Sequence, residues 1–312
     1  MAKPGVIQLQ LAVLFFCISV LLGPLANADA GKQRNFMLVF DVKDYSAQIK
    51  EAVTYFFDHV FQKGDQLIIV SPHRLVGFSP EKLSAPKNQL VTNILKILKE
   101  DISKSMHMYR STLEEMTQNV RALSGSGGTS AAGGAKGILN SYQQNRQILL
   151  TLRGNIEDRL MKYAKIFRRV KGENHLLMFL QKEVRPVPDR ETMERLRQNP
   201  VQIGFQAVEV FMGEDYKTVL DFKKIETALK YARVRFHLLY LQPAELRSRR
   251  GVDFIENSGD IYSAFSNITK ATDGIKLTTS NPSSFLKKIE RLVEGKVEVE
   301  VIDQEMKEEG KK

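Results

Sequence analysis

Histidines and a glycine-rich stretch are the residues whose types most often mark catalytic or ligand sites. The five histidines lack the spacing of metal-binding pairs; they are His59, His73, His107, His175 and His237. In the glycine-rich segment 124–137, Gly137 follows Lys136, whereas a nucleotide-binding phosphate loop needs Ser or Thr after its lysine. No G-x-S-x-G motif marks a nucleophilic serine. The sequence therefore indicates no catalytic motif, and the two histidines in strand-like segments, His175 and His237, are expected in the core or at a sheet edge.

Polar residues that directly follow apolar runs are better candidates for a binding site. They are Asp41, Lys43, Asp44 and Ser46 after the run 36–40, and Gln181 and Glu183 after the run 175–180. In open parallel sheets, ligands bind at the carboxyl ends of the strands. We therefore expect these side chains to lie at one edge of a sheet. The loops at 71–73 and 124–134, and the chain from Gln242 onward, belong to the same expected edge.

Apolar runs and helical spacing alternate along the chain. The runs 36–40, 66–70, 175–180 and 234–241 are apolar at nearly every position, which is typical of parallel strands buried on both faces. Segments with apolar residues three and four apart separate them. This pattern predicts an α/β, Rossmann-like three-layer sandwich with a mostly parallel sheet, whose central strand is 36–40.

Two long amphipathic tracts interrupt this alternation. Apolar residues recur over 88–123 with a mean step near the coiled-coil period, and a second tract runs from about residue 137 to Val170. The tracts predict a helical hairpin insertion over 87–172, which protrudes from the sheet or covers one face of it. An exposed apolar stripe on the hairpin would mark self-association, which polar substitutions at Leu152 and Ile156 would test.

Weaker patterns fill the rest of the chain. The sequence predicts a polar segment with a short helix over 185–200, a short strand at 208–211 and a basic loop over 243–259. Asn281 and Pro282 predict the start of a last helix that ends at Val293. Alternating valines predict a half-exposed strand over 296–302, and a disordered tail is expected over 304–312.

The first thirty residues have the layout of a cleaved secretory signal peptide. Lys3 precedes an apolar run from Leu9 to Leu22, and small residues up to Ala30 suit a signal peptidase. The run is shorter than the ~20 residues of a spanning helix. We therefore expect an exported protein, periplasmic or secreted, with no transmembrane span after cleavage. Cys17 lies in this segment, so the mature chain is expected to have no disulfide, and the net charge of +10 is spread over scattered basic residues.

The ordered set of segments resembles a known family. Asp41 after the first buried strand, Gly127-Gly128-Thr129 before a helix, and the strand 175–180 occur in the order of a von Willebrand factor A domain. The segment 264–277 resembles the last helix, turn and strand of that fold. The chain is similar to bacterial exported proteins with a von Willebrand A-related domain. This resemblance implies one such domain over 31–303.

The resemblance also implies a metal-ion-dependent adhesion site, in which an Asp-x-Ser-x-Ser loop, a threonine and a second aspartate hold Mg²⁺. Asp41 takes the first position and Thr129 can supply the threonine. The two serine positions are Lys43 and Tyr45, and no aspartate follows the strand 175–180. An ammonium at Lys43 would pair with Asp41 and repel a divalent cation, and Mg²⁺ gives up its water reluctantly. We therefore expect a degenerate, metal-free site, with Mg²⁺ at Asp41 and Thr129 as the alternative and no other cofactor.

These expectations together predict an exported protein-binding module, an adhesin or scaffold without catalysis. Its partner would be another envelope or extracellular protein, and no basic-aromatic module indicates nucleic acid. One alternative is a metal-dependent adhesin in which Asp44, Ser46 or Glu183 supplies the missing ligands. Another is a hydrolase whose catalytic residues meet only in the fold.

Overall fold

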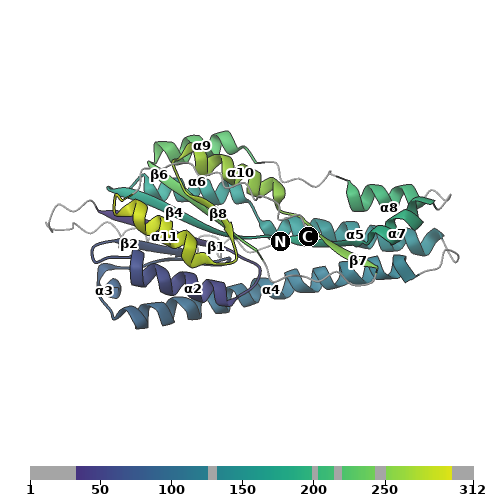
Figure 1. Ribbon diagram of the computed structural model, residues 1–312, viewed down its shortest axis with the longest axis horizontal. Coiled ribbons are helices and arrows are strands. Elements are labelled where there is room, and N and C mark those ends of the chain that lie inside the picture. The colour runs from purple at the N-terminus through teal and green to yellow at the C-terminus, as the bar shows by residue number, and fades with distance from the viewer. Residues whose placement is uncertain (1–32, 126–131, 199–202, 214–219, 243–250, 297–312) are drawn as a thin grey trace, which may run out of the picture.

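A six-stranded sheet forms the centre of the molecule (Figure 1). The computed structural model describes residues 33–125, 132–198, 203–213, 220–242 and 251–296. The strands, in the order in which they pair, are β3 (Leu75–Gly77), β2 (Gln66–Val70), β1 (Arg34–Asp41), β4 (Glu173–Gln181), β6 (Val234–Leu241) and β8 (Lys276–Thr279). Every neighbouring pair is parallel except β2 and β3. β1 lies inside the sheet between β2 and β4, as the run 36–40 predicted.

Helices cover both faces of this sheet (Figure 1). One face carries α2 (Ala47–Tyr55), the π-helical turn η1 (Phe56–Val60), the start of α4 (Lys87–Gly125) and α11 (Pro282–Val293). The other carries α6 (Ile156–Phe167), α9 (Phe222–Tyr231) and α10 (Gly259–Ala271). A short helix, α3 (Pro80–Leu83), joins β3 to α4. The α/β class and the mostly parallel sheet are therefore confirmed. We call the sheet and these helices the sheet region.

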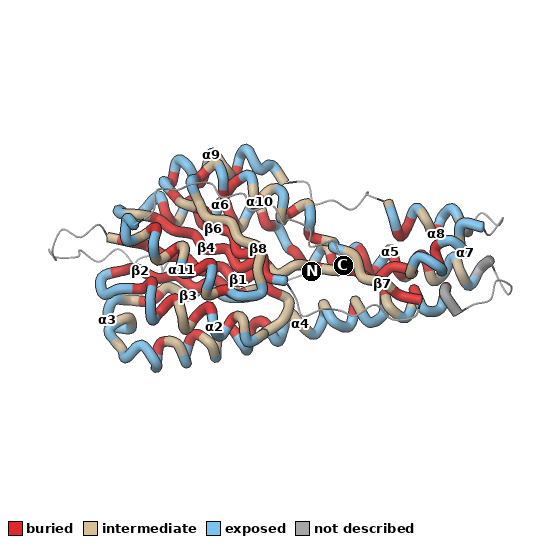
Figure 2. Tube along the Cα trace, viewed as in Figure 1, coloured by how far each residue is buried: buried red, intermediate tan, exposed pale blue. Residues whose placement is uncertain are grey.

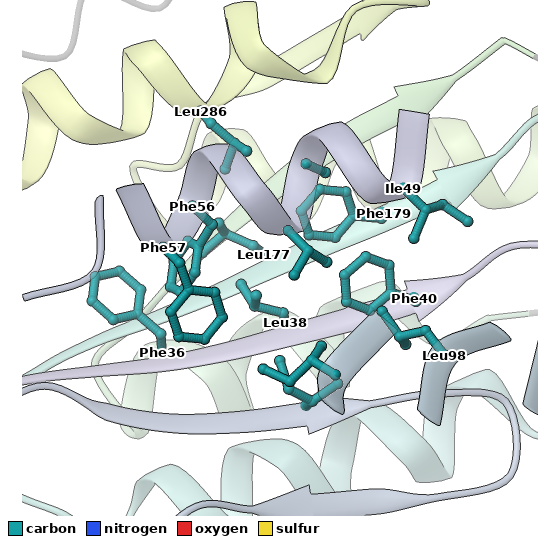
Figure 3. Packing of buried hydrophobic residues seen from close by; sticks show 14 of the residues in the cluster. Phe36, Leu38, Phe40, Ile49, Phe56, Phe57, Leu98, Leu177, Phe179 and Leu286 are labelled. Carbon is teal, nitrogen blue, oxygen red and sulfur yellow. The ribbon is translucent and has the colours of Figure 1, made fainter. Parts of the chain in front are cut away.

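Alternate residues of β1 enter the cores on opposite faces of the sheet. Phe36, Leu38 and Phe40 pack under α2 and α11, whereas Met37 and Val39 pack under α6. Figure 3 shows the first of these cores, in which the rings of Phe40 and Phe179 stack with their centroids 4.6 Å apart. A strand buried on both faces has no solvent side, which is why its sequence is continuously apolar.

The helix α4 extends past the sheet into a third core (Figures 1 and 2). Its first half packs on the sheet through Ile94, Leu98 and Ile102, and its second half contributes Met116 and Val120 to the third core. That core is completed by α5 (Ala132–Arg153), α7 (Arg190–Gln198), α8 (Ile203–Met212) and β7 (Val252–Glu256), and β5 (Val184–Pro188) pairs with β7 beside it. We call the second half of α4 and these five elements the arm.

The predicted loop 71–73 holds α4 against the sheet. The hydroxyl of Ser71 donates a hydrogen bond to Asp101, and Arg74 forms an ion pair with the same carboxylate at 3.1 Å. One turn further on, Ser105 Oγ and His73 Nε2 lie 2.8 Å apart. These side chains therefore fix the helix at the point where it leaves the sheet.

The prediction of one continuous helix from about residue 137 to Val170 is wrong, because the structure has two helices there. The break lies at Gly154, whose φ of +64° is a backbone conformation that favours glycine. Asn155 then caps α6, because its Oδ1 accepts a hydrogen bond from the Asp158 backbone N–H at 3.0 Å. Only α5 pairs with α4, and α6 turns back to cover the sheet. Leu152 is half-buried and Ile156 is 3% exposed, so the stripe is packed inside the protein.

Two further predictions fail in the arm, and a third is incomplete. The predicted strand 208–211 lies inside helix α8, and the predicted loop 243–259 contains strand β7. The segment 185–200 contains α7 near the expected position, but it opens with strand β5, which pairs antiparallel with β7. The arm is therefore assembled from three separated stretches of sequence rather than from two consecutive helices alone.

The last helix begins as predicted, because Asn281 Oδ1 accepts hydrogen bonds from the backbone N–H groups of Ser283 and Ser284. The expected signal peptide, the strand 296–302 beyond Lys296, and the tail 304–312 lie outside the described residues. Within the part of the chain that the structure describes, no helix is both long and apolar enough to cross a membrane.

Candidate functional site

The carboxyl edge of the sheet brings together the predicted residues from two neighbouring strands. Asp41 is the last residue of β1 and Gln181 the last of β4, and the two strands pair in parallel. Lys43 and Glu183 follow two residues after each strand end. The sheet register therefore places these four side chains at one site.

Lys43 lies between two carboxylates. Its Nζ is 3.3 Å from Asp41 Oδ1 and 3.2 Å from Glu183 Oε1, and its side chain is 12% exposed. The expected pairing of Lys43 with Asp41 is thus confirmed, and Glu183 adds a second carboxylate to it. The ammonium therefore bridges the two acids.

Gln181 fixes the loop that carries Lys43. Its side-chain oxygen accepts hydrogen bonds from the backbone N–H groups of Lys43, at 2.7 Å, and Asp44, at 3.0 Å. These contacts turn the backbone after β1 so that the lysine side chain points back at Asp41. Gln181 therefore fixes the conformation of the loop that carries Lys43.

Two arginines complete the site, and no sequence motif pointed to them. Arg159 of α6 places Nη2 3.0 Å from Asp41 Oδ2. Arg153, the last residue of α5, lies 2.8 Å from Glu183 Oε2 through Nε and 3.3 Å from Asp260 Oδ2 through Nη1. Arg153 also donates to the backbone carbonyl of Asn257. The turn at Gly154 allows both arginines to reach the same edge of the sheet.

These six residues form what we call the edge cluster: Asp41, Lys43, Arg153, Arg159, Glu183 and Asp260. Three acids face three bases, so the charges balance. Five of the side chains are at most 14% exposed. A buried charge without a partner is strongly destabilising, so this balance is a condition for burying the cluster at all.

The electrostatics keep both sides of the central pair charged. Burial raises the pKa of Asp41, but the positive charges of Lys43 and Arg159 outweigh it and lower that pKa to about 2. For Lys43, burial lowers the pKa, and the charges of Asp41 and Glu183 outweigh it and raise the pKa above its usual range. Groups that hold their charge so firmly transfer protons poorly at neutral pH.

The other two loop candidates lie outside the cluster. Asp44 forms an ion pair with Arg110 of α4 at 3.2 Å, and both side chains are exposed. Ser46 precedes α2 without a side-chain capping hydrogen bond. Both residues sit at the rim and remain accessible from solvent. Thr129, the candidate threonine, lies outside the described residues.

A chain of hydroxyl groups connects the edge cluster to the arm. The Glu183 backbone N–H donates to Ser258 Oγ at 2.9 Å, and Ser258 Oγ lies 2.6 Å from the Tyr240 hydroxyl. Tyr240 also donates to Glu256 of β7 at 2.6 Å. Burial, together with the hydrogen bond to Glu256, raises the pKa of Tyr240, so its hydroxyl keeps its proton. The cluster thus lies where the sheet region meets β7.

A second buried polar pair lies inside the sheet region, away from this edge. His237 Nδ1 accepts a hydrogen bond from the Ile275 backbone N–H at 3.0 Å, so the neutral ring carries its proton on Nε2. That nitrogen lies 3.2 Å from His175 Nδ1. Burial lowers the pKa of His175 to about 4 and that of His237 well below its usual range. Both histidines are core residues and both are neutral at neutral pH.

Among the residues that the structure describes, no group of three or more His, Cys, Asp or Glu side chains could hold a metal ion. Comparison with known proteins gave no matching family model and no matching curated protein.

Proposed function

We propose that this chain is an exported, non-catalytic protein-binding module of the von Willebrand A-like, Rossmann-like class, and that the arm carries its contact surface. The strand order and the position of Asp41 at the end of an interior strand support the class. The expected partner is another envelope or extracellular protein. The edge cluster takes the place of the family's cation site and joins the arm to the sheet region.

The exposed face of α8 is the observation that carries this proposal. Phe205 is 75% exposed and Met212 is 54% exposed. They are seven residues apart, which puts them on one side of the helix. Ala207, Val210 and Phe211 face the arm core instead. A large exposed aromatic ring beside an exposed methionine is typical of a protein contact surface.

The position of Lys43 supports a role without a bound metal. Its ammonium already pairs with Asp41 and Glu183, at 3.3 and 3.2 Å. A divalent cation at this edge would have to displace that ammonium or be repelled by it. Mg²⁺ also needs near-ideal octahedral oxygen coordination, which a cluster with three basic side chains does not favour.

Site-specific photo-crosslinking tests the contact surface. A crosslinking amino acid at position 205 or 212 should capture the same protein in the native cell envelope, and one at the exposed position 96 of α4 should not. Phe205→Ser with Met212→Ser should then abolish binding of the purified partner at unchanged folding. Equal capture from all three positions, or binding that survives the double substitution, would refute α8 as the contact surface.

The metal-dependent adhesin is the alternative that a direct measurement separates from this proposal. Isothermal titration with Mg²⁺ and with Mn²⁺ should give no heat for the protein, because Lys43 holds the acidic site. Lys43→Ser places a serine at the first serine position of the Asp-x-Ser-x-Ser loop, and its titration is compared with that of the unaltered protein. Heat of binding and a raised melting temperature in the unaltered protein would favour the adhesin.

A further inference from the structure

Four cations lie along the second half of α6 and the turn that follows it. Lys162 and Lys165 are three residues apart on α6, and Arg168 and Arg169 lie in the turn after its last residue. All four are exposed. The helix α9 lies beside α6, over the same face of the sheet (Figure 1). This surface is separate from both the edge cluster and the exposed face of α8.

A hollow of about 640 Å³ lies between these two helices. Its apolar lining comes from Met161, Ala164 and Ala228. The four cations and one acid, Asp158, form the rest of the lining. We call this hollow and its cations the basic groove. It combines small apolar groups with a strongly positive rim.

The cations of the basic groove differ from other cations of the same surface. Lys224 is paired with Glu157 at 2.6 Å, and Lys230 with Glu226 at 2.7 Å. Within the described residues, none of the four groove cations forms an ion pair with a carboxylate. Their positive charge is therefore available to a ligand at the surface.

An aromatic ring stands at the end of the groove. Tyr231 is 74% exposed, and the guanidinium of Arg168 lies 4.6 Å from its ring centroid. A tyrosine with an apolar ring and a polar hydroxyl suits the boundary between an apolar layer and water. Arg168 and Tyr231 therefore present a cation and an aromatic side chain together.

We propose that the basic groove is a docking surface for an anionic phospholipid membrane. Headgroup phosphates would pair with the four cations, and the glycerol and upper acyl carbons would contact Met161, the two alanines and Tyr231. The cations supply charge complementarity, and the apolar lining fits an amphiphile better than it fits a uniformly polar polyanion. This inference rests on the surface alone and is independent of the contact proposed for α8.

Binding to vesicles of stated composition tests the inference. The full chain should sediment with vesicles of phosphatidylglycerol in phosphatidylcholine, should not sediment with pure phosphatidylcholine, and should be released by salt. Each cation near such a surface is worth roughly fivefold in binding. Lys162→Gln, Lys165→Gln and Arg169→Gln together should therefore weaken the partition coefficient on the order of 100-fold.

A matched variant controls for net charge. Lys96→Gln, Lys99→Gln and Lys104→Gln remove three exposed cations from α4, which packs on the opposite face of the sheet. This variant should keep most of the binding, and circular dichroism should show both triple variants folded. Equal losses in the two variants would overturn the proposal, as would equal binding to both vesicle types. Binding of an acidic peptide at the groove without vesicle binding would also overturn it and identify a protein ligand.

Discussion

The sheet region and the arm are stabilised by different means. In the sheet region, apolar strands are covered by helices on both faces, and the burial of apolar area is the main source of stability. In the arm, buried Arg146 and Arg185 donate hydrogen bonds to the backbone carbonyls of Val210 and Phe211 in α8. Buried Tyr142 donates to the carbonyl of Pro186 at 2.7 Å. Apolar packing is not directional, whereas these hydrogen bonds fix positions, so the two regions should respond differently to substitution.

The largest effect is expected in the sheet core. Phe179→Ala should lower the free energy of unfolding by about 3–5 kcal/mol, because it removes a ring that is 1% exposed and stacked on Phe40. Urea unfolding followed by circular dichroism measures this. Met108→Ala, at an exposed position of α4, provides the control. A loss of less than about 1 kcal/mol would mean that packing area does not dominate this region.

A nearly equal effect is expected from acid, through the buried histidines His175 and His237 in the sheet region. The folded pKa of His175 is about 4 and its ordinary value 6.5, so the folded state disfavours the protonated ring. Stability from this difference is present above pH 6.5 and is lost as the pH falls toward 4. The loss amounts to roughly 3 kcal/mol.

Thermal unfolding across this pH range tests the prediction: His175→Gln should reduce the pH dependence, and Met108→Ala, at an exposed position without a titratable group, is the control. Arg235 and Arg34 also oppose protonation of His175, whereas Glu173, with Oε2 3.8 Å from His175 Nε2, favours it. An unchanged pH dependence in His175→Gln would assign the acid sensitivity to other groups.

A smaller and more local effect is expected in the arm. Arg185→Ala should cost roughly 1–3 kcal/mol, since it leaves the Phe211 carbonyl and the Tyr142 hydroxyl without their buried donor. Hydrogen exchange should accelerate in α8 and β5 and stay unchanged in β1 and β4. Arg197→Ala, which removes an exposed ion pair with Glu194, is the control. Acceleration throughout the sheet would show that the two regions unfold as one.

The smallest effect is expected on the exposed side of α8. Phe205→Ser with Met212→Ser should change the free energy of unfolding by no more than ~0.5 kcal/mol, because neither side chain is packed. Chemical denaturation measures this directly. A clearly larger loss would mean that these residues pack within the arm, and they could then not serve as a free contact surface.

The difference between the sheet region and the arm also explains which elements could be predicted from the sequence. Strands β1, β2, β4 and β6 were predicted because continuous apolar runs reflect burial on both faces. The strand β5 was missed because Pro186 and Pro188 argue against a strand, and its partner β7 lies more than sixty residues away. The edge cluster was predicted at Asp41, Lys43 and Glu183, which follow strands, but not at Arg153 or Arg159, whose roles arise only when two helices meet the sheet edge.

Two of the errors had local signals that would have corrected them. Ala207, Val210 and Phe211 have the spacing of a helix face, whereas the short segment 208–211, apolar except at Glu209, was predicted as a strand. Gly154 followed by Asn155, with acidic residues at 157 and 158, is typical of one helix ending and another beginning. The arm was therefore predicted incorrectly for two reasons. The pairing of β5 with β7 joins residues far apart in the sequence, and a short apolar segment does not distinguish a strand from a helix.

The continuity of α4 has a mechanical consequence. A single helix of 39 residues, about 58 Å long, belongs to the cores of both regions, so no flexible linker separates them along this element. A force on the arm would be transmitted to the sheet region through one continuous helix, and would not open a hinge along α4. The two regions are therefore expected to keep a fixed separation along this helix.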